Sequence, residues 1–161
     1  MLLVPTSKLF SVAQKENITI EWTNFSSPEM QGIYVVDPAV GSPIIGLSKT
    51  LEANERKLRC VLAHELGHHF RTAGKWITAA CQMDKLLIAK IDREADDWAL
   101  DTLLPSKGFV TRLKGGMCVS GLADSFFVTE EFVIKKLKQL ERRGFKHLIN
   151  TDKGSFIFYQ L

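Results

Sequence analysis

The first half of the chain changes from a helical pattern of apolar residues to short apolar runs. Over residues 5–16, Leu9, Val12 and Ala13 recur at helical spacing among polar side chains, which predicts a short amphipathic helix. Apolar and β-branched runs follow, each bounded by residues that favour turns. They predict three short strands, at residues 18–22, 32–36 and 44–47. A small N-terminal β-sheet is therefore expected.

Helical patterns dominate the rest of the chain. Asn54 is a suitable N-cap for a helix that extends to about Phe70. A second helix is expected from about Met83 to Leu104, where Pro105 ends it. Further elements are expected toward the C-terminus: helices at residues 122–126 and 130–142, and a terminal hairpin of residues 145–148 and 155–159. The whole pattern predicts an α+β fold, in which a small sheet precedes a mainly helical remainder.

Composition places the chain among soluble globular proteins. It has 161 residues, of which 45% are hydrophobic and 24% charged, enough for one compact domain or one domain with a small appended module. The apolar start ends at Pro5, too short for a signal peptide, and no apolar run is long enough to cross a membrane. Three widely spaced cysteines without a CxxC pair favour neither a disulfide framework nor a cysteine zinc site. The cytoplasm is the expected compartment.

Positive charge is concentrated in the last third of the chain. Residues 1–104 hold 11 Lys or Arg against 13 Asp or Glu, whereas residues 105–161 hold 10 against 5. Such a basic region can attract an acidic protein or nucleic acid, but a basic solvated surface is the commoner outcome.

Residues 64–68 carry the clearest chemical signal, the sequence His-Glu-Leu-Gly-His. Residues four apart lie on one face of a helix, so His64 and His68 can share a zinc ion while Glu65 reaches the water bound to it. Zinc makes that water more acidic, and Glu65 can accept its proton and return it to a departing amide nitrogen. Peptide-bond hydrolysis is the natural reaction. Manganese and iron are alternative metals, because ligand type does not separate them from zinc.

Two histidines leave a catalytic zinc site one protein ligand short, since such sites usually have three. Glu94 is the leading candidate, because it lies on a separate predicted helix that can fold back beside the first. The same helix offers four alternatives: Asp92, Asp96, Asp97 and Asp101. With Glu94 as reference, a rotation of about 100° per residue places Asp97 and Asp101 on its face and points Asp96 away. Asp97 or Asp101 is therefore expected to accept the Nδ1 proton of a zinc-bound histidine.

A peptidase site also needs a donor that stabilises the oxyanion of the tetrahedral intermediate. Four residues could supply it: Tyr34, His69, His147 and Tyr159. Each is more often a packing or surface residue, so the sequence does not single one out.

The motifs together resemble the ImmA/IrrE family of metallopeptidases. The similarity rests on four segments in the order and spacing of the family: residues 32–34 and 44–47, the run CVLAHELGHH at residues 60–69, and READDWALDTLLP at residues 93–105. Trp98 in place of the usual Phe, and Leu104 followed directly by Pro105 without the frequent Met between them, are mild departures. The resemblance covers roughly residues 30–140 and implies a helical, zincin-like core beside the small sheet.

This resemblance also implies roles for particular residues. It implies that Glu65 is the catalytic base and that His64, His68 and Glu94 are the metal ligands. These roles agree with the chemistry argued from the motif. Asp96 belongs to the family signature as well, which conflicts with the helical-face argument and leaves the partner of the histidine open. The family further implies a cytoplasmic, site-specific protease that cuts helix-turn-helix repressors of mobile elements, prophages or stress responses.

Residues 121–137 read like a helix-turn-helix, with Thr129 as the cap of its second helix. Basic side chains on that helix could face phosphates: Lys135, Lys136, Lys138, Arg142 and Arg143. In the resembling family this module lies beside the peptidase core and need not bind DNA, so packing or partner recognition is favoured over nucleic-acid binding. We expect a peptidase core at residues 1–110 and a helix-turn-helix-like module, packed on it, at residues 111–161.

Two functions compete at this point. The leading interpretation is a zinc-dependent endopeptidase whose partner is a protein substrate, a helix-turn-helix repressor. The alternative is a zinc-stabilised, non-catalytic module that binds a repressor or antitoxin partner. Glu65 favours the endopeptidase, because a structural zinc site needs neither a base nor an open coordination position.

Overall fold

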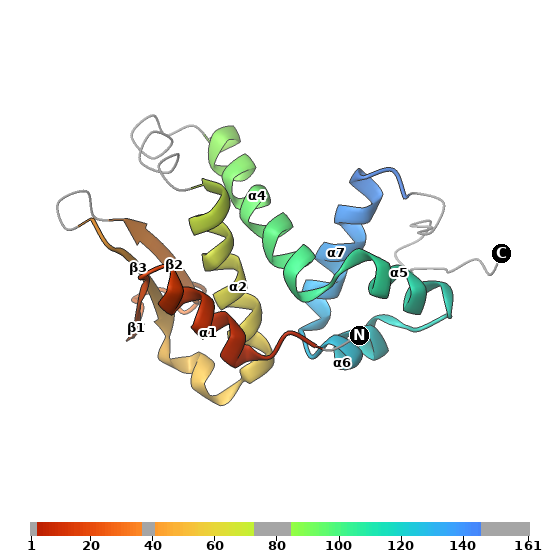
Figure 1. The fold of residues 1–161 in the computed structure, drawn as a ribbon, viewed down its shortest axis with the longest axis horizontal. Helices are drawn as coiled ribbons and strands as arrows, with labels where there is room; N and C mark the ends of the chain where they lie inside the picture. The colour runs from red at the N-terminus through yellow and green to blue at the C-terminus, as the bar shows by residue number, and fades with distance from the viewer. Residues whose placement is uncertain (1–2, 37–40, 73–84, 146–161) are drawn as a thin grey trace.

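The computed structural model describes residues 3–36, 41–72 and 85–145 (Figure 1). The short helix α1 (Thr6–Lys15) and a small sheet lie on one side of two long helices, and three shorter C-terminal helices lie on the other. This α+β arrangement confirms the predicted fold class. The predicted terminal hairpin lies outside the described residues, apart from Phe145.

The sheet has three strands in the order β1-β3-β2: β1 (Thr19–Thr23), β2 (Gly32–Val36) and β3 (Pro43–Ser48). β1 runs parallel to β3 and pairs Thr19 with Ile44, while β2 runs antiparallel to β3 and pairs Gly32 with Leu47. The central strand is the most buried of the three, because Ile45 and Leu47 belong to the main hydrophobic core. Because the strand order places β2 last, β2 is an edge strand of the sheet that the described residues form.

The helix that carries the motif, α2 (Glu55–Thr72), follows a 3₁₀ turn, η1 (Lys49–Ala53). The predicted N-cap is present, since the backbone N–H of Lys57 donates to Oδ1 of Asn54 at 3.0 Å. The helix therefore begins where the sequence predicts. Three leucines on one side of α2 are buried in the main core: Leu58, Leu62 and Leu66. The second long helix, α4 (Lys85–Leu103), runs antiparallel to α2 along the side that carries the motif (Figure 1).

Gly67 allows α2 and α4 to lie unusually close together. A Cβ atom at this position would overlap the backbone of Ala95 in α4, chiefly its carbonyl oxygen. Glycine in a helix interior costs about 1 kcal/mol relative to alanine, and here the close contact of two helices explains its presence. This contact brings the carboxylates of α4 to the histidines of α2.

Gly67→Ala should destabilise the protein by roughly 1–3 kcal/mol, because the methyl group must push two packed backbones apart. Urea unfolding followed by circular dichroism measures the change. The matched control is Gly121→Ala in a later helix, where the atoms nearest to the added methyl are side-chain atoms of Met117 and Cys118. That variant should be neutral or gain up to about 1 kcal/mol from helix propensity. Equal stability of Gly67→Ala and the wild type would contradict the close-contact explanation.

Three helices follow Pro105: α5 (Ser106–Lys114), α6 (Val119–Phe126) and α7 (Glu130–Arg142). The sequence pattern predicts α6 and α7 but not α5, although Phe109 and Leu113 are spaced for one helical face and are both buried. Phe127 adopts a left-handed conformation, with φ of 52°, at the turn between α6 and α7. The predicted cap is present, because Oγ1 of Thr129 accepts from the backbone N–H of Phe132 at 3.2 Å.

One hydrophobic core joins the N-terminal and C-terminal elements. Leu9 and Leu47 belong to the same buried cluster as Phe126 and Leu140. The expected boundary between residues 110 and 111 falls inside α5. The C-terminal helices thus pack directly on the core that supports α2. Among the described residues, no helix is long and apolar enough to span a membrane.

Candidate metal centre

The two histidines of α2 point the same way from successive turns. Their Nε2 atoms lie 3.1 Å apart, and their rings meet edge to face at 4.7 Å between centroids. Two imidazole nitrogens bound to one tetrahedral zinc ion at about 2.1 Å would lie about 3.4 Å apart. His64 and His68 therefore hold nearly the spacing that a shared metal ion requires.

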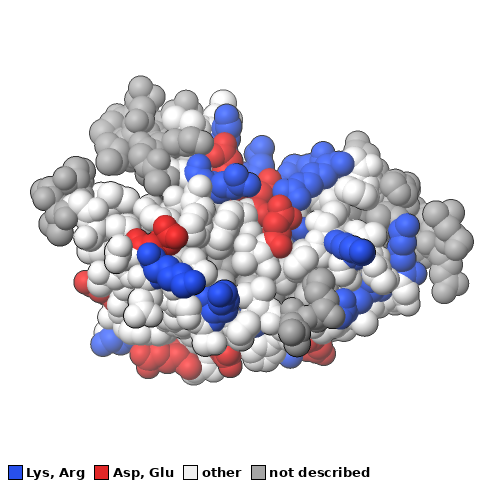
Figure 2. Space-filling view, viewed as in Figure 1, with Lys and Arg blue, Asp and Glu red and all other residues white. Residues whose placement is uncertain are grey.

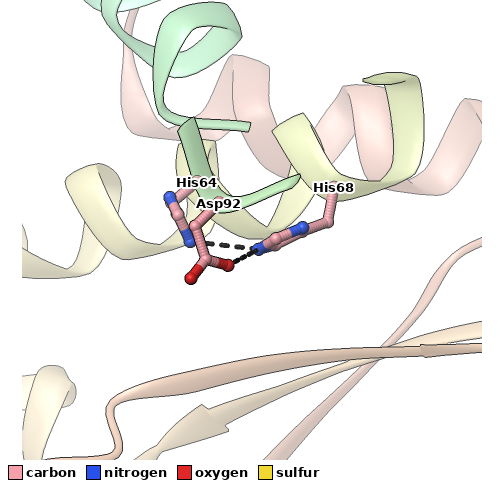
Figure 3. Close-up of side chains that lie close together, drawn as sticks. All are labelled: His64, His68 and Asp92. Carbon is pink, nitrogen blue, oxygen red and sulfur yellow. Dashed lines mark hydrogen bonds and ion pairs between the residues drawn. The ribbon is translucent and has the colours of Figure 1, made fainter. Parts of the chain in front are cut away.

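Asp92 of α4 completes a group of three possible ligands with these histidines (Figure 3). Its Oδ1 lies 3.7 Å from Nε2 of His68, and one ligand atom from each residue lies within 4.8 Å of the others. Two imidazoles and a carboxylate form a donor set that suits zinc, as well as manganese or iron. The described residues therefore contain a three-ligand site that fits a divalent metal.

Glu94, the residue expected as third ligand, is not a member of this group. It lies two residues beyond Asp92 on α4, which is a rotation of about 200° around the helix axis. Ala95 and Asp92 lie on the side of α4 that faces α2, as the contact of Ala95 with Gly67 shows. The structure thus brings Asp92, one of the four alternatives, to the position expected for Glu94.

Asp96 holds the ring of His64 in place. Its Oδ1 lies 2.8 Å from Nδ1 of His64, so Nδ1–H donates to the carboxylate and Nε2 remains for the metal. Burial lowers the pKa of His64, but the hydrogen bond to Asp96 and the nearby carboxylates outweigh this effect and raise it. Asp96 is four residues from Asp92 and shares its helical face. The expectation that Asp96 points away was wrong because it took Glu94 as the reference.

A threonine that sequence reasoning missed has the equivalent place beside His68. Oγ1 of Thr72 donates to the backbone oxygen of His68 at 2.8 Å and lies 3.1 Å from its Nδ1. The hydroxyl therefore accepts from Nδ1–H, which again leaves Nε2 for the metal. Burial and the neighbouring His64 lower the pKa of His68 to about 4, so its ring is neutral at pH 7 and has no proton to lose on binding metal. The i, i+4 spacing of His68 and Thr72 was the available sequence signal.

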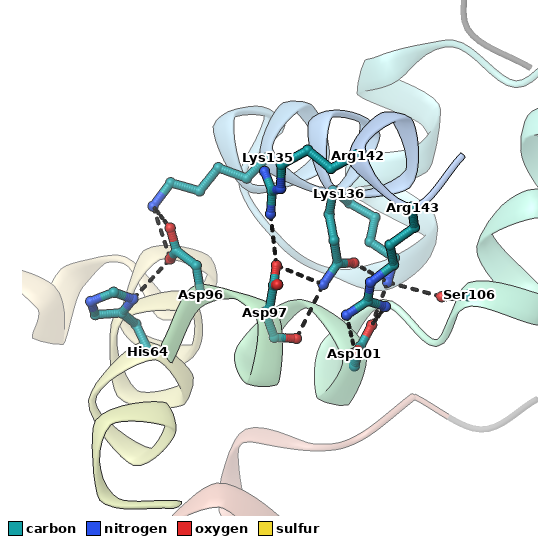
Figure 4. A network of polar contacts seen from close by, with 10 residues as sticks. His64, Asp96, Asp97, Asp101, Ser106, Lys135, Lys136, Arg142 and Arg143 are labelled. Atoms are coloured by element: carbon teal, nitrogen blue, oxygen red, sulfur yellow. Dashed lines mark hydrogen bonds and ion pairs between the residues drawn. The ribbon is translucent and has the colours of Figure 1, made fainter. Parts of the chain in front are cut away.

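Asp97 and Asp101, the residues expected to hold a histidine, bind α7 instead (Figure 4). Asp97 accepts from Gln139 at 3.0 Å and from Arg142 at 2.8 Å. Asp101 accepts from Lys136 at 2.8 Å and from both terminal nitrogens of Arg143 at 2.9 Å. Four of the five basic side chains considered as phosphate contacts therefore contact aspartates of α4: Lys135, Lys136, Arg142 and Arg143. Figure 2 shows blue and red side chains gathered together at the top of the view, in the region where Figure 1 draws α4 and α7.

Asp101→Asn should lower stability at neutral pH but not in acid. Burial raises the pKa of Asp101, but hydrogen bonds from Arg143 and Lys136 outweigh it and lower the pKa below the ordinary value. A lowered pKa contributes stability above the unfolded value of about 4, and this contribution is lost as the pH falls through the folded value. Urea unfolding at several pH values should show the wild type and variant converging below about pH 4. A difference that stays constant down to pH 2 would refute the proposed role of this carboxylate.

The acidic residue of the motif, Glu65, is buried beside the ligands, with 5% of its surface exposed. Burial raises its pKa to about 7, and the carboxylates of Asp92 and Asp96 act in the same direction while His64 opposes them. Gly32 of β2 makes room for this side chain, because a Cβ atom there would lie 2.6 Å from Oε1 of Glu65. The carboxyl group is therefore held between α2 and the edge strand, next to the candidate metal position.

Comparison with known proteins supports this interpretation. The sequence profile of the M78 peptidases, described as the IrrE N-terminal-like domain, matches residues 13–138. The chain belongs to this peptidase family. Searches of curated proteins and of solved structures found no match. The family assignment and the His-His-Asp group together indicate a metallopeptidase-type role.

Two cavities meet at the motif of this peptidase-family chain. The larger, of about 520 Å³, is lined by His64 and Glu65, by the segment before and at the start of β2, and by Phe132 and Lys135 of α7. The smaller, of about 290 Å³, is lined by the same two motif residues and by Tyr34, His68 and Asp92. Both cavities border Gly32, so the open space follows the edge strand past the candidate metal position.

Of the two expected oxyanion donors that the structure describes, Tyr34 lines this space and His69 does not. Tyr34 lines the smaller cavity together with both histidines of the motif, and its hydroxyl lies 2.9 Å from Nδ1 of His69. His69 in turn lies 3.5 Å from Glu16, on the far side of its ring. His147 and Tyr159 lie outside the described residues.

Proposed function

We propose that the chain is a zinc-dependent endopeptidase in which His64, His68 and Asp92 bind the metal. The observation that carries the proposal is the buried carboxyl of Glu65, held beside a three-residue ligand group at the meeting point of two cavities. A structural metal site needs neither a carboxyl group that can act as a base nor open space beside the metal. Manganese or iron could take the place of zinc with the same ligands.

Each residue of the site has its own role in the proposed peptide-bond hydrolysis. A bound zinc ion supplies Lewis acidity, which polarises a carbonyl group and makes water more acidic. Glu65 takes a proton from the attacking water and passes it to the nitrogen of the departing amine. Asp96 and Thr72 hold the two imidazole rings with Nε2 directed to the metal. Tyr34 is placed to donate to the oxyanion once its hydroxyl turns from His69.

The edge strand suggests the shape of the substrate. β2 has one side unpaired in the described sheet and lies beside Glu65, so an extended peptide can add to it as a further strand. Main-chain hydrogen bonds to β2 would then place one peptide bond over the ligand group. This arrangement favours an endopeptidase that cuts an extended segment of a protein.

The substrate class that we propose is a helix-turn-helix repressor of a mobile element, prophage or stress response, cut in the cytoplasm. It rests on the resemblance to the ImmA/IrrE peptidases, which the family match supports. Nucleic acid is not proposed as a partner, because the basic side chains of α7 are largely engaged with α4. The alternative, a zinc-stabilised module that acts on a repressor or antitoxin by binding alone, predicts the same contacts without cleavage.

Profiling of protein N-termini in the native cells tests the proposal. Cells that express the wild-type chain should contain a small set of new N-termini, at least one from a DNA-binding repressor, that cells expressing Glu65→Gln lack. A purified repressor found in this way should be cut at the same bond in vitro when zinc is supplied. If the two chains give identical sets of N-termini while both still alter gene expression, the binding-only alternative is correct.

A further inference from the structure

Asp96 is shared between the candidate metal centre and the C-terminal helix α7. Its Oδ1 accepts from Nδ1 of His64 at 2.8 Å and from Nζ of Lys135 at 3.1 Å. Its Oδ2 accepts from the same Nζ at 3.0 Å. Figure 4 shows the carboxylate between the imidazole ring and the lysine. The three residues in contact come from three helices: His64 from α2, Asp96 from α4 and Lys135 from α7.

We propose that Lys135 is a positioning residue of the metal centre, which fixes the carboxylate of Asp96 and thereby the ring of His64. The inference rests on the proposed metal site. An aspartate on a helix can turn about two side-chain bonds, and the single hydrogen bond to His64 would not hold both of its oxygens. Lys135 contacts both oxygens and so selects one orientation. Groups that orient a metal-bound histidine in this way contribute substantially to metal affinity.

The remaining contacts of α7 separate this role from simple docking of the helix. Lys136, Arg142 and Arg143 join α7 to Asp97 and Asp101, and none of them contacts a histidine of the site. Lys135 keeps 42% of its side chain exposed, so its loss leaves no cavity in the core. A change at Lys135 should therefore affect the metal site while the helix stays in place.

Cobalt(II) binding to the purified full-length chain tests the inference, because the visible absorption of cobalt reports both affinity and ligand geometry. Lys135→Met should weaken binding about tenfold and alter the absorption spectrum. Lys135→Arg, which can also contact both oxygens, should restore affinity to within about threefold of the wild type. The matched control is Arg143→Met, which removes two contacts to Asp101 and should bind cobalt as the wild type does.

A double-mutant cycle adds the decisive comparison. If Lys135 acts through Asp96, then Lys135→Met should cause little further loss in an Asp96→Asn background. Wild-type affinity and spectrum in Lys135→Met, an equal loss in Arg143→Met, or fully additive losses in the double variant would each overturn the inference while leaving the metal site standing. A wild-type chain that binds no cobalt would overturn the metal site and the inference together.

Discussion

Glu65→Gln should abolish cleavage of the protein substrate while zinc binding stays unchanged. The amide has nearly the shape of the carboxyl, so it fits the space beside Gly32, but it cannot accept a proton from water. General bases contribute roughly 100-fold to 10,000-fold to rate, so residual cleavage should be about 1% of the wild type or less. Mass spectrometry of timed digests measures cleavage, and a chelator competition assay measures zinc affinity.

Glu52→Gln is the matched control for this variant. Glu52 is an exposed residue of η1 and lines neither cavity, so the same chemical change there should leave cleavage and zinc affinity at their wild-type values. Cleavage by Glu65→Gln at more than about a tenth of the wild-type rate would show that Glu65 is not the general base. Loss of zinc along with cleavage would instead assign Glu65 a place among the ligands.

Asp92→Asn should weaken zinc binding by more than about 100-fold. Residues that only orient a ligand cost 10-fold to 100-fold when they are changed, and the loss of a charged ligand must exceed that. Competition with a chromophoric chelator at pH 7 measures the affinity. Cleavage should fall in parallel and return partly when zinc is added in excess.

Glu94→Gln provides the comparison within the same helix. Because Glu94 lies outside the ligand group, its variant should keep zinc affinity within about threefold of the wild type. The reverse result, a large loss for Glu94→Gln and a small one for Asp92→Asn, would restore Glu94 as the third ligand. The pair of variants thus decides between the sequence-based expectation and the geometry.

The fold could largely be predicted from local sequence signals. The strands at residues 19–23, 32–36 and 43–48 coincide with apolar runs bounded by turn residues, and the start of α2 follows from the cap at Asn54. Helix α5 was not predicted because it is short and its N-cap position is Pro105, whose side chain makes no capping hydrogen bond. The order of the strands follows from no local signal, since β1 and β2 both pair with β3 and are not neighbours.

The candidate site was predictable only where one helix determines it. His64, Glu65 and His68 follow from spacing within α2, which needs no knowledge of the rest of the fold. The third ligand depends on which face of α4 meets α2, and the contact of Gly67 with Ala95 sets that face. With Glu94 as the reference, the helical-face argument predicts Asp97 or Asp101 as the partner of a histidine, whereas in the structure Asp96 contacts His64. The family signature includes Asp96, and this residue does contact His64 in the structure. Asp92 lies one helical turn from Asp96 and therefore on the same face of α4.

The contact between Lys135 and Asp96 joins residues that are 39 positions apart in the chain. No periodicity links them, and the basic pattern of α7 was equally consistent with a surface that binds phosphates. The fold decides the matter by packing α7 against α4, so that most of its basic side chains meet aspartates.

Crystals grown with zinc, with diffraction recorded on both sides of the zinc absorption edge, would show whether His64, His68 and Asp92 bind one zinc ion. We expect one strong anomalous peak at the meeting point of the two cavities, about 2.0–2.2 Å from Nε2 of His64, Nε2 of His68 and a carboxylate oxygen of Asp92, with one position open to water. A peak coordinated by Glu94 in place of Asp92, or no peak between the histidines, would contradict the proposed metal site.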